Sequence, residues 1–290
     1  MIRSNRISLC TAMIFCTMLL AAPSHAQEVS YDLSFGAPNS HLIDVAIRAG
    51  GLNGSVDFSM PAWAPGWYVI NDYAKFVQGF SAKSPAGAPL AWHKTDKQTW
   101  RIDLGSSNAV TVSYRVYGNT PGVDSMQFNS SHVHIPGPAV WMYLINGKQR
   151  PAKLTIHPPN GWKIATGMTA EGQYSFSAPD YDTFIDCPIE ISDFAEKAFD
   201  LDGTIYHVVV HDIAGKKDFS DFAANLQKAV QQLVAIDAPV AGTSARKAPF
   251  AQYYFLFHIM PNTGGGLEHL NSTQIFLGSD WDADSFAGSA

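Results

Sequence analysis

Apolar and polar residues alternate in short runs over roughly the first two thirds of the chain. The clearest run is residues 110–117, and residues 42–47, 100–104 and 153–157 follow the same period of two. This period is typical of strands that bury one face. Clusters of Gly, Pro, Asn and Ser separate the runs. The chain is therefore mainly β, and we predict an N-terminal antiparallel β-sandwich-like domain.

The pattern changes after Phe199. The predicted elements are then an apolar strand at residues 204–210, a helix between Asp218 and Pro239, and strands at residues 253–260 and 272–277. Asp218 or Ser220 can cap the helix, whose apolar positions recur at helical spacing from Phe222 through Leu233 to Val234. Strand, helix, strand, strand is the start of a mixed α/β domain. We place the N-terminal β domain at residues 27–200 and the second domain at residues 201–290.

Residues 1–26 have the pattern of a secretory signal peptide. Arg3 and Arg6 precede an apolar stretch from Leu9 to Ala22, which is short for a membrane span. Residues 24–26, Ser-His-Ala, fit a cleavage site. The alternative interpretation is a membrane anchor. We predict a secreted or periplasmic protein with no membrane span in its mature form.

Charge and cysteine content narrow the candidate chemistry. The formal net charge is −6, and no basic stripe is present, so we predict no nucleic-acid partner. Cys10 and Cys16 lie in the signal peptide, which leaves Cys187 alone. Cys187 lies in an apolar context before Pro188, and we interpret it as a buried, inert thiol rather than a nucleophile.

The main candidate site is the run from Gly264 to His269, where three glycines precede Leu267, Glu268 and His269. Glycines allow a peptide backbone to approach and pair with a strand edge, and a carboxylate beside them can bind an ammonium group. The plainer interpretation is a glycine-rich turn with a solvated Glu268. His269 can contact substrate, orient Glu268, or play a structural part.

Three segments in order resemble the glycyl aminopeptidases, a branch of the gluzincin zinc metallopeptidases. Residues 61–74 resemble a Trp-x-Pro-Gly-x-Tyr segment, residues 181–190 an Asp-x-Pro-Ile-Glu segment at a domain junction, and residues 265–273 a Gly-Gly-Leu-Glu-His-x-x-Ser segment. The similarity extends over essentially the whole chain after the signal peptide. The three segments are fairly specific because they occur together at plausible spacing.

The resemblance implies an N-terminal β domain, then a thermolysin-like catalytic domain, and commonly a PDZ domain. It implies that the complete enzyme uses zinc to remove N-terminal residues from peptides. It also implies that Gly265, Gly266, Glu268 and His269 bind the peptide substrate, with Glu268 receiving its α-amine. The chain contains no His-Glu-x-x-His motif. We therefore expect the start of a catalytic domain that ends before the zinc motif, with no catalytic residues and no metal in this chain.

The leading hypothesis is thus the N-terminal fragment of a secreted zinc aminopeptidase, inactive by itself, so whether this chain is an enzyme stays open. The first alternative is a non-catalytic periplasmic peptide-binding β module. A carbohydrate-binding sandwich is a weaker alternative that rests only on the aromatic residues near Trp63. We interpret Trp63, Trp67, Tyr68 and Tyr73 as packing residues.

The remaining polar groups suggest less. His132 and His134 fall on one face of a strand, but no third ligand lies nearby in sequence. His207 and His211 are too far apart along a strand to share a metal. We interpret the segment from Asp186 to Glu190 as a structural junction rather than an acid–base pair.

Overall fold

The structure is a computed structural model that describes residues 27–215, 218–236 and 248–279. The predicted signal peptide at residues 1–26 and the helix stop at Pro239 lie outside these residues. The described chain is mainly β, as predicted, and its strands form four sheets. Among the described residues, no helix has both the length and the apolar character needed to cross a membrane.

The first sheet is antiparallel except where β1 and β11 pair in parallel. In spatial order its strands are β13 (Thr169–Ala170), β14 (Ser175–Ala178), β11 (Ala152–Ile156), β1 (Val29–Phe35), β2 (Leu42–Gly50), β7 (Ala109–Tyr117) and β4 (Val77–Lys83). The predicted runs at residues 42–47, 110–117 and 153–157 are β2, β7 and β11, so these three strand predictions are confirmed to within a few residues.

Two smaller antiparallel sheets complete the N-terminal region. The second sheet is, in spatial order, β10 (Tyr143–Leu144), β3 (Ser55–Ser59), β6 (Thr99–Asp103) and β5 (Trp92–Lys94). The third sheet is β12 (Lys163–Thr166), β15 (Ile189–Ser192), β9 (His132–Ile135) and β8 (Gln127–Phe128). Short helices connect some of these strands: α1 (Tyr181–Ile185) and the 3-10 helices Pro38–Ser40, Tyr73–Phe76 and Gly137–Ala139.

One continuous core lies among these three sheets. Ile47 and Val112 are register partners on the buried face of the first sheet, and they share the core with Phe58 of the second sheet and Ile191 of the third. All four side chains are fully buried. Burying one face of each strand explains the period of two in the sequence, because successive side chains point to opposite faces.

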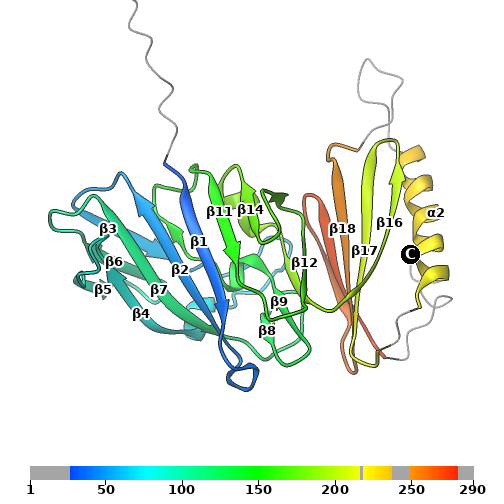
Figure 1. The fold of residues 1–290 in the computed structure, drawn as a ribbon, viewed down its shortest axis with the longest axis horizontal. Coiled ribbons are helices and arrows are strands. Elements are labelled where there is room, and N and C mark those ends of the chain that lie inside the picture. The colour runs from blue at the N-terminus through cyan, green and yellow to red at the C-terminus, as the bar shows by residue number, and fades with distance from the viewer. Residues whose placement is uncertain (1–26, 216–217, 237–247, 280–290) are drawn as a thin grey trace, which may run out of the picture.

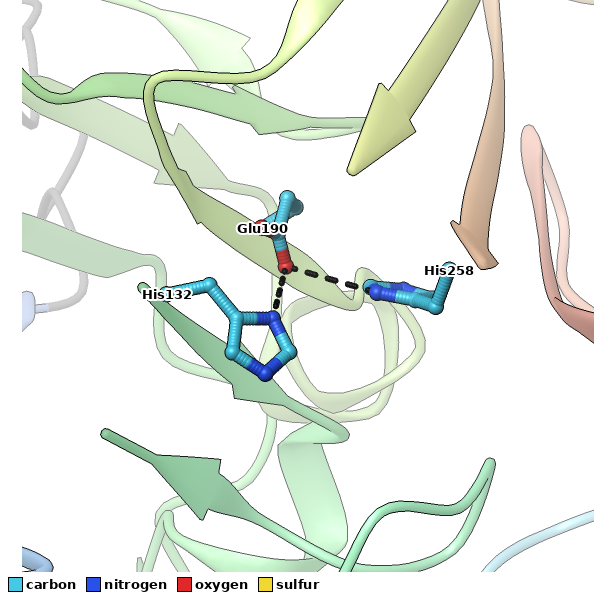
Figure 2. A group of neighbouring side chains, drawn as sticks. All are labelled: His132, Glu190 and His258. Carbon is cyan, nitrogen blue, oxygen red and sulfur yellow. Dashed lines mark ion pairs between the residues drawn. The ribbon is translucent and has the colours of Figure 1, made fainter. Parts of the chain in front are cut away.

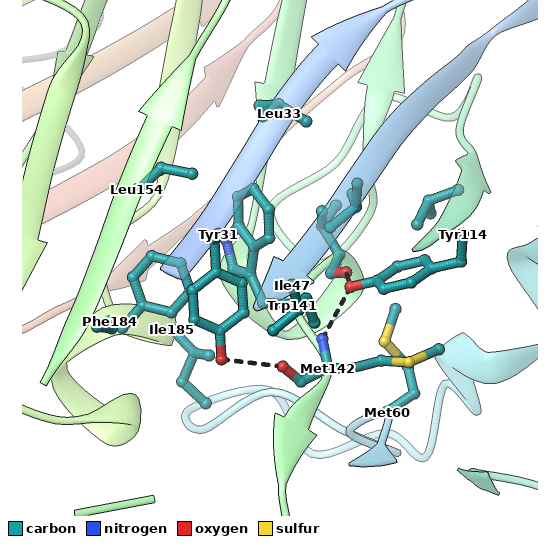
Figure 3. Packing of buried hydrophobic residues seen from close by; sticks show 14 of the residues in the cluster. Tyr31, Leu33, Ile47, Met60, Tyr114, Trp141, Met142, Leu154, Phe184 and Ile185 are labelled. Atoms are coloured by element: carbon teal, nitrogen blue, oxygen red, sulfur yellow. Dashed lines mark hydrogen bonds between the residues drawn. The ribbon is translucent and has the colours of Figure 1, made fainter. Parts of the chain in front are cut away.

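Buried tyrosines tie the segment around Trp141 into this core (Figure 3). The Tyr31 hydroxyl donates to the Met142 carbonyl at 3.1 Å, and the Tyr114 hydroxyl donates to the Val140 carbonyl at 2.8 Å. The indole ring of Trp141 itself packs against Phe184, with ring centroids 5.3 Å apart. The backbone of this segment is buried and irregular, so its carbonyl groups at Val140 and Met142 accept hydrogen bonds from tyrosine hydroxyls instead of from a neighbouring strand.

Gly137 lies where this segment passes α1, and we expect Gly137→Ala to lower the free energy of unfolding by about 2–3 kcal/mol. A Cβ at residue 137 would lie 2.2 Å from the Ile185 carbonyl oxygen and 2.6 Å from the Ile185 Cα. These are backbone atoms, which cannot turn aside as a side chain can. Urea unfolding measures the change. Gly172→Ala is the control, because a Cβ there meets no atom within 4 Å, and equal stability losses in both variants would contradict this account.

The fourth sheet is mixed and carries the longer helix. In spatial order it contains β16 (Ala195–Leu201), β17 (Thr204–Asp212), β18 (Gln252–Ile259), β20 (Ser272–Leu277) and β19 (Gly265–Glu268). Strands β17, β18 and β20 run parallel, whereas β16 and β19 are antiparallel edges. Figure 1 shows this sheet beside the third sheet, with helix α2 (Ser220–Ile236) on its far side. The predicted order of strand, helix, strand, strand is confirmed, and the short β19 adds one more strand.

Helix α2 forms for the reasons that the sequence suggests. The Asp218 carboxylate accepts a hydrogen bond from the Ser220 backbone N–H at 3.0 Å, so it caps the first turn. Phe222 and Leu226 are buried against the sheet, where the Phe222 ring lies edge-on to Phe257 at 4.8 Å. Leu233 is 63% exposed. The buried stripe of the helix is therefore narrower than its run of apolar residues.

The other face of the fourth sheet packs against the third sheet. Val209 of β17 and Leu256 of β18 lie there in a small buried cluster with Ala165 and Phe194. Because β16 begins at Ala195, the chain enters the fourth sheet just after this cluster. The joint between the two regions is therefore a packed interface and not an exposed linker.

Candidate functional site

The glycine-rich run forms β19, the last strand of the fourth sheet. It pairs antiparallel with β20, so that Leu267 lies opposite Gln274 and Glu268 lies opposite Thr273. No described strand pairs with the other side of β19. A strand edge of this kind presents backbone N–H and C=O groups with which an extended peptide can pair.

The glycines keep this edge open. Cβ atoms added at Gly264 and Gly265 would meet nothing within 4 Å, and one at Gly266 would come no nearer than 3.7 Å to the Gln274 carbonyl oxygen. Gly265 has a φ of +121°, in a region that side chains other than glycine's rarely adopt. The open space and the backbone conformation both fit a strand that another chain can approach closely.

Glu268 is exposed at the end of β19. Its register partner Thr273 is hydrogen-bonded through its hydroxyl to the Tyr253 hydroxyl. Burial chiefly, and the Glu268 carboxylate in addition, raise the pKa of Tyr253, against the opposing effect of the Thr273 hydrogen bond. Glu268 therefore adds negative charge next to Tyr253, beside an open strand edge.

His269 is held inside the structure rather than at the open edge. Its side chain is 6% exposed, and its Nδ1 donates to the Asp186 carboxylate at 2.9 Å. The Gln274 amide donates to His269 Nε2 at 3.1 Å and also to the Val123 carbonyl at 2.6 Å. Asp186 accepts a second hydrogen bond, from the Leu270 backbone N–H at 2.8 Å. These contacts fix the turn that follows Glu268.

The aromatic loop of residues 61–74 lies against β19. Trp67 packs against a small buried cluster that includes Leu267. Gly66 has a φ of +79°, and a Cβ added there would lie only 2.8 Å from Leu267 Cδ1. Tyr73 is buried, as predicted, but Trp63 is 52% exposed and Tyr68 is 99% exposed. The packing interpretation is therefore wrong for Trp63 and Tyr68, because the loop anchors through only some of its aromatic rings.

The segment from Asp186 to Glu190 is the structural junction that the sequence suggests. Asp186 reaches the turn after β19, while Glu190 is buried in the third sheet. The two carboxylates therefore face different surroundings. Cys187 is buried, as expected, and burial, with a contribution from Asp186, raises the pKa of its thiol to about 12. That thiol stays protonated at neutral pH and is a poor nucleophile.

A second polar group lies at the joint between the third and fourth sheets. Figure 2 shows His132 and His258 directed toward the Glu190 carboxylate. His134 and His211 lie around them, since their rings are 4.4 Å from His258 and 4.2 Å from His132, respectively. The spacing of His132 and His134 indicated part of this cluster. The sequence did not indicate that Glu190 and His258 belong to the cluster, because they lie on strands that are distant from His132 in the sequence.

His207 does not belong to this cluster. Its Nδ1 pairs with Glu196 at 2.7 Å, and its ring stacks on Tyr254 at 4.3 Å. His207 and His211 therefore contact different groups, in keeping with the prediction that they lie too far apart along the strand to share a metal ion. In the buried cluster, the Ser131 hydroxyl lies 3.5 Å from His211 Nε2, and His211 Nδ1 lies 3.9 Å from Glu190 Oε1.

The described fold is thus a mainly β region of three sheets joined to a mixed five-stranded sheet that carries one helix and has an open edge at β19. Residues 30–193 match the Peptidase M61 N-terminal domain, which is more than half of the chain. The chain therefore belongs to the Peptidase M61 family and represents its N-terminal portion. The matched residues end just before β16 begins at Ala195.

Several solved structures are similar to this chain to different degrees. An aminopeptidase N family protein from Idiomarina loihiensis is 27% identical with a TM-score of 0.78, and the match covers 87% of this chain and 42% of that one. Native yeast LTA4 hydrolase is 13% identical with a TM-score of 0.50, covering 87% and 40% of the two chains. An M1 zinc metallopeptidase mutant from Deinococcus radiodurans is 12% identical with a TM-score of 0.47, covering 87% and 60%. A comparison with curated proteins found no match.

Proposed function

We propose that this chain is the N-terminal part of a secreted zinc aminopeptidase and that it supplies the peptide-recognition edge of that enzyme. Family membership supports a peptidase-related module. The chain covers only 42% of the similar Idiomarina loihiensis protein, so the complete enzyme's activity, its zinc and its peptide substrate are part of the proposal. Secretion, or export to the periplasm, rests on the pattern of residues 1–26.

The observation that carries the proposal is the exposed Glu268 carboxylate at the end of an open, glycine-rich edge strand. A peptide that adds to β19 would place its backbone against residues 265–268. Its terminal ammonium would then form a charge-assisted hydrogen bond with Glu268. His269, held by Asp186 and Gln274, acts as a positioning residue that fixes the strand end from which Glu268 projects.

The division into domains follows the same proposal. Residues 27 to about 194 form the N-terminal β domain, and the residues from β16 onward begin the catalytic domain. Our boundary at residue 200 from the sequence lies inside β16, and sheet membership favours the earlier position. The catalytic chemistry requires a His-Glu-x-x-His motif, which the sequence does not contain. This chain's own residues therefore bind and orient the peptide.

Peptide binding tests the proposal directly. We expect the full chain to bind a short peptide with a free N-terminus and to bind its N-acetylated counterpart at least about tenfold more weakly, because acetylation removes the ammonium charge. Isothermal titration calorimetry gives the affinities. NMR shifts of the amides of Gly265, Gly266 and Glu268 locate the peptide. Equal affinities, or shifts confined to another surface, would contradict the assignment.

Hydrolysis separates this proposal from the alternative of a non-catalytic peptide-binding module. The chain alone is expected to leave Gly- and Ala-anilides intact, whereas the enzyme purified from its host should cleave them and lose activity with a chelator. A host protein that binds peptides but cleaves none would favour the binding module. Chelator-sensitive cleavage by the chain alone would contradict its assignment as the recognition part.

A further inference from the structure

Three side chains at the joint between the third and fourth sheets converge on one point (Figure 2). His132 comes from β9, Glu190 from β15 and His258 from β18. Their side chains are at most 1% exposed. Each offers a ligand atom, and these atoms lie within 4.8 Å of one another. They come from three strands that are distant in sequence, so the convergence is a property of the fold.

Two of the three distances within this group are close to those of atoms that share a cation. Glu190 Oε2 lies 3.4 Å from His132 Nδ1 and 3.6 Å from His258 Nδ1. A direct N–H···O hydrogen bond measures about 2.7–3.2 Å. Two ligands bound to one tetrahedral zinc at about 2.0–2.1 Å lie about 3.3 Å apart. None of these three atoms has a hydrogen-bond partner among the described residues.

The orientation of His132 supports the same conclusion. Its Nε2 lies 2.8 Å from Gln127 Oε1, an acceptor, so Nε2 carries a proton; in the neutral ring, Nδ1, which faces Glu190, then carries a lone pair. A lone pair facing a carboxylate oxygen is repulsive unless a positive charge lies between them. Metal-binding histidines commonly donate their second ring N–H to an oxygen in this way, which fixes the ring and its tautomer.

Electrostatics make a bare carboxylate costly here. The Glu190 side chain is 1% exposed, and neither of its carboxylate oxygens has a hydrogen-bond partner among the described residues. A buried anion requires a compensating positive charge.

We propose that His132, Glu190 and His258 bind one first-row divalent cation of the zinc class. Two imidazoles and a carboxylate, with no thiolate, form a ligand set that suits zinc. His211 Nδ1 lies 3.9 Å from the other carboxylate oxygen, Glu190 Oε1, and is outside this group of three. Complete burial leaves no room for substrate, so the ion is structural.

The ion would join the two parts of the chain. His132 and Glu190 belong to the N-terminal β region, whereas His258 and His211 belong to the fourth sheet. The apolar cluster at this joint is small, with Val209 and Leu256 at its centre. A metal bound across the joint would add stability that depends on metal concentration. It would fix the fourth sheet, and with it β19, relative to the N-terminal region.

Metal content and stability of the full chain, expressed without a histidine tag, test the inference. After zinc loading and dialysis, mass spectrometry of the metal should find about one zinc per chain. Removal of the metal by a chelator should lower the Tm by about 5–10 °C. Less than a tenth of an equivalent of zinc, with a Tm that chelator leaves unchanged, would overturn the proposal. A hydrogen-bonded imidazolium–carboxylate network would then account for the cluster.

Variants place the metal at this site. Glu190→Gln and His258→Gln should each reduce bound zinc at least about tenfold, whereas His157→Gln, at an exposed histidine on the N-terminal region, should retain it. Zinc retained by both buried-site variants would overturn the assignment. If these variants do not fold, X-ray absorption spectroscopy of the zinc-loaded wild type shows which atoms bind the zinc. A shell of imidazole nitrogen and carboxylate oxygen without sulfur is expected, and a shell of water alone would refute the site.

Discussion

Glu268→Gln is expected to weaken the binding of peptides with a free N-terminus by about tenfold to a hundredfold. The amide keeps the size and shape of the carboxylate but loses the charge. A hydrogen bond to a charged group contributes about 1.5–3 kcal/mol, which corresponds to that loss of affinity. Glu268 is exposed at the end of an open strand, so the substitution should leave the fold intact. Titration calorimetry with free and N-acetylated peptides measures the effect.

The N-acetylated peptide provides the decisive comparison for Glu268. It carries no ammonium group, so its affinity should change little in the variant. Glu28→Gln is a matched control, because Glu28 is also exposed and precedes the distant strand β1. If Glu268→Gln weakens the binding of free and acetylated peptides by the same factor, Glu268 does not bind the α-amine. The glycine-rich strand then has only a structural role.

Trp141→Ala is expected to lower the free energy of unfolding by about 3–5 kcal/mol. The Trp141 side chain is fully buried, with its ring 5.3 Å from Phe184 and 5.8 Å from Tyr31. Its carbonyl accepts a hydrogen bond from the Tyr181 hydroxyl at 2.6 Å. Alanine would leave a cavity that this tyrosine-anchored backbone cannot close. Urea unfolding followed by circular dichroism gives the change.

Trp63→Ala is the control for Trp141, because the Trp63 side chain is 52% exposed. Surface substitutions commonly change stability by no more than about 0.5 kcal/mol. Comparable losses in the two variants would show that the buried cluster around Trp141 is not the main source of stability in the N-terminal region. Trp141→Phe should fall between the wild type and Trp141→Ala, because a phenylalanine ring fills part of the cavity.

Local patterns in the sequence account for most of the elements. The alternating run at residues 110–117 became β7, and the capped apolar period after Asp218 became α2. Both patterns depend on neighbours within a few residues, so tertiary contacts were not needed to recognise them. Burial of Cys187 also followed from its apolar surroundings. The exposure of Leu233 did not, because the width of a buried face depends on what packs against it.

The sequence by itself determined the mainly β class, the single long helix among the described residues, and the glycine-rich segment with Glu268. These features arise from side-chain period, capping and backbone freedom, which are local. Only the tertiary structure decided that Asp186 holds His269, and that Glu190 lies between His132 and His258. The packing of the third sheet against the fourth brings these residues together across long stretches of chain, and no local pattern encodes that packing.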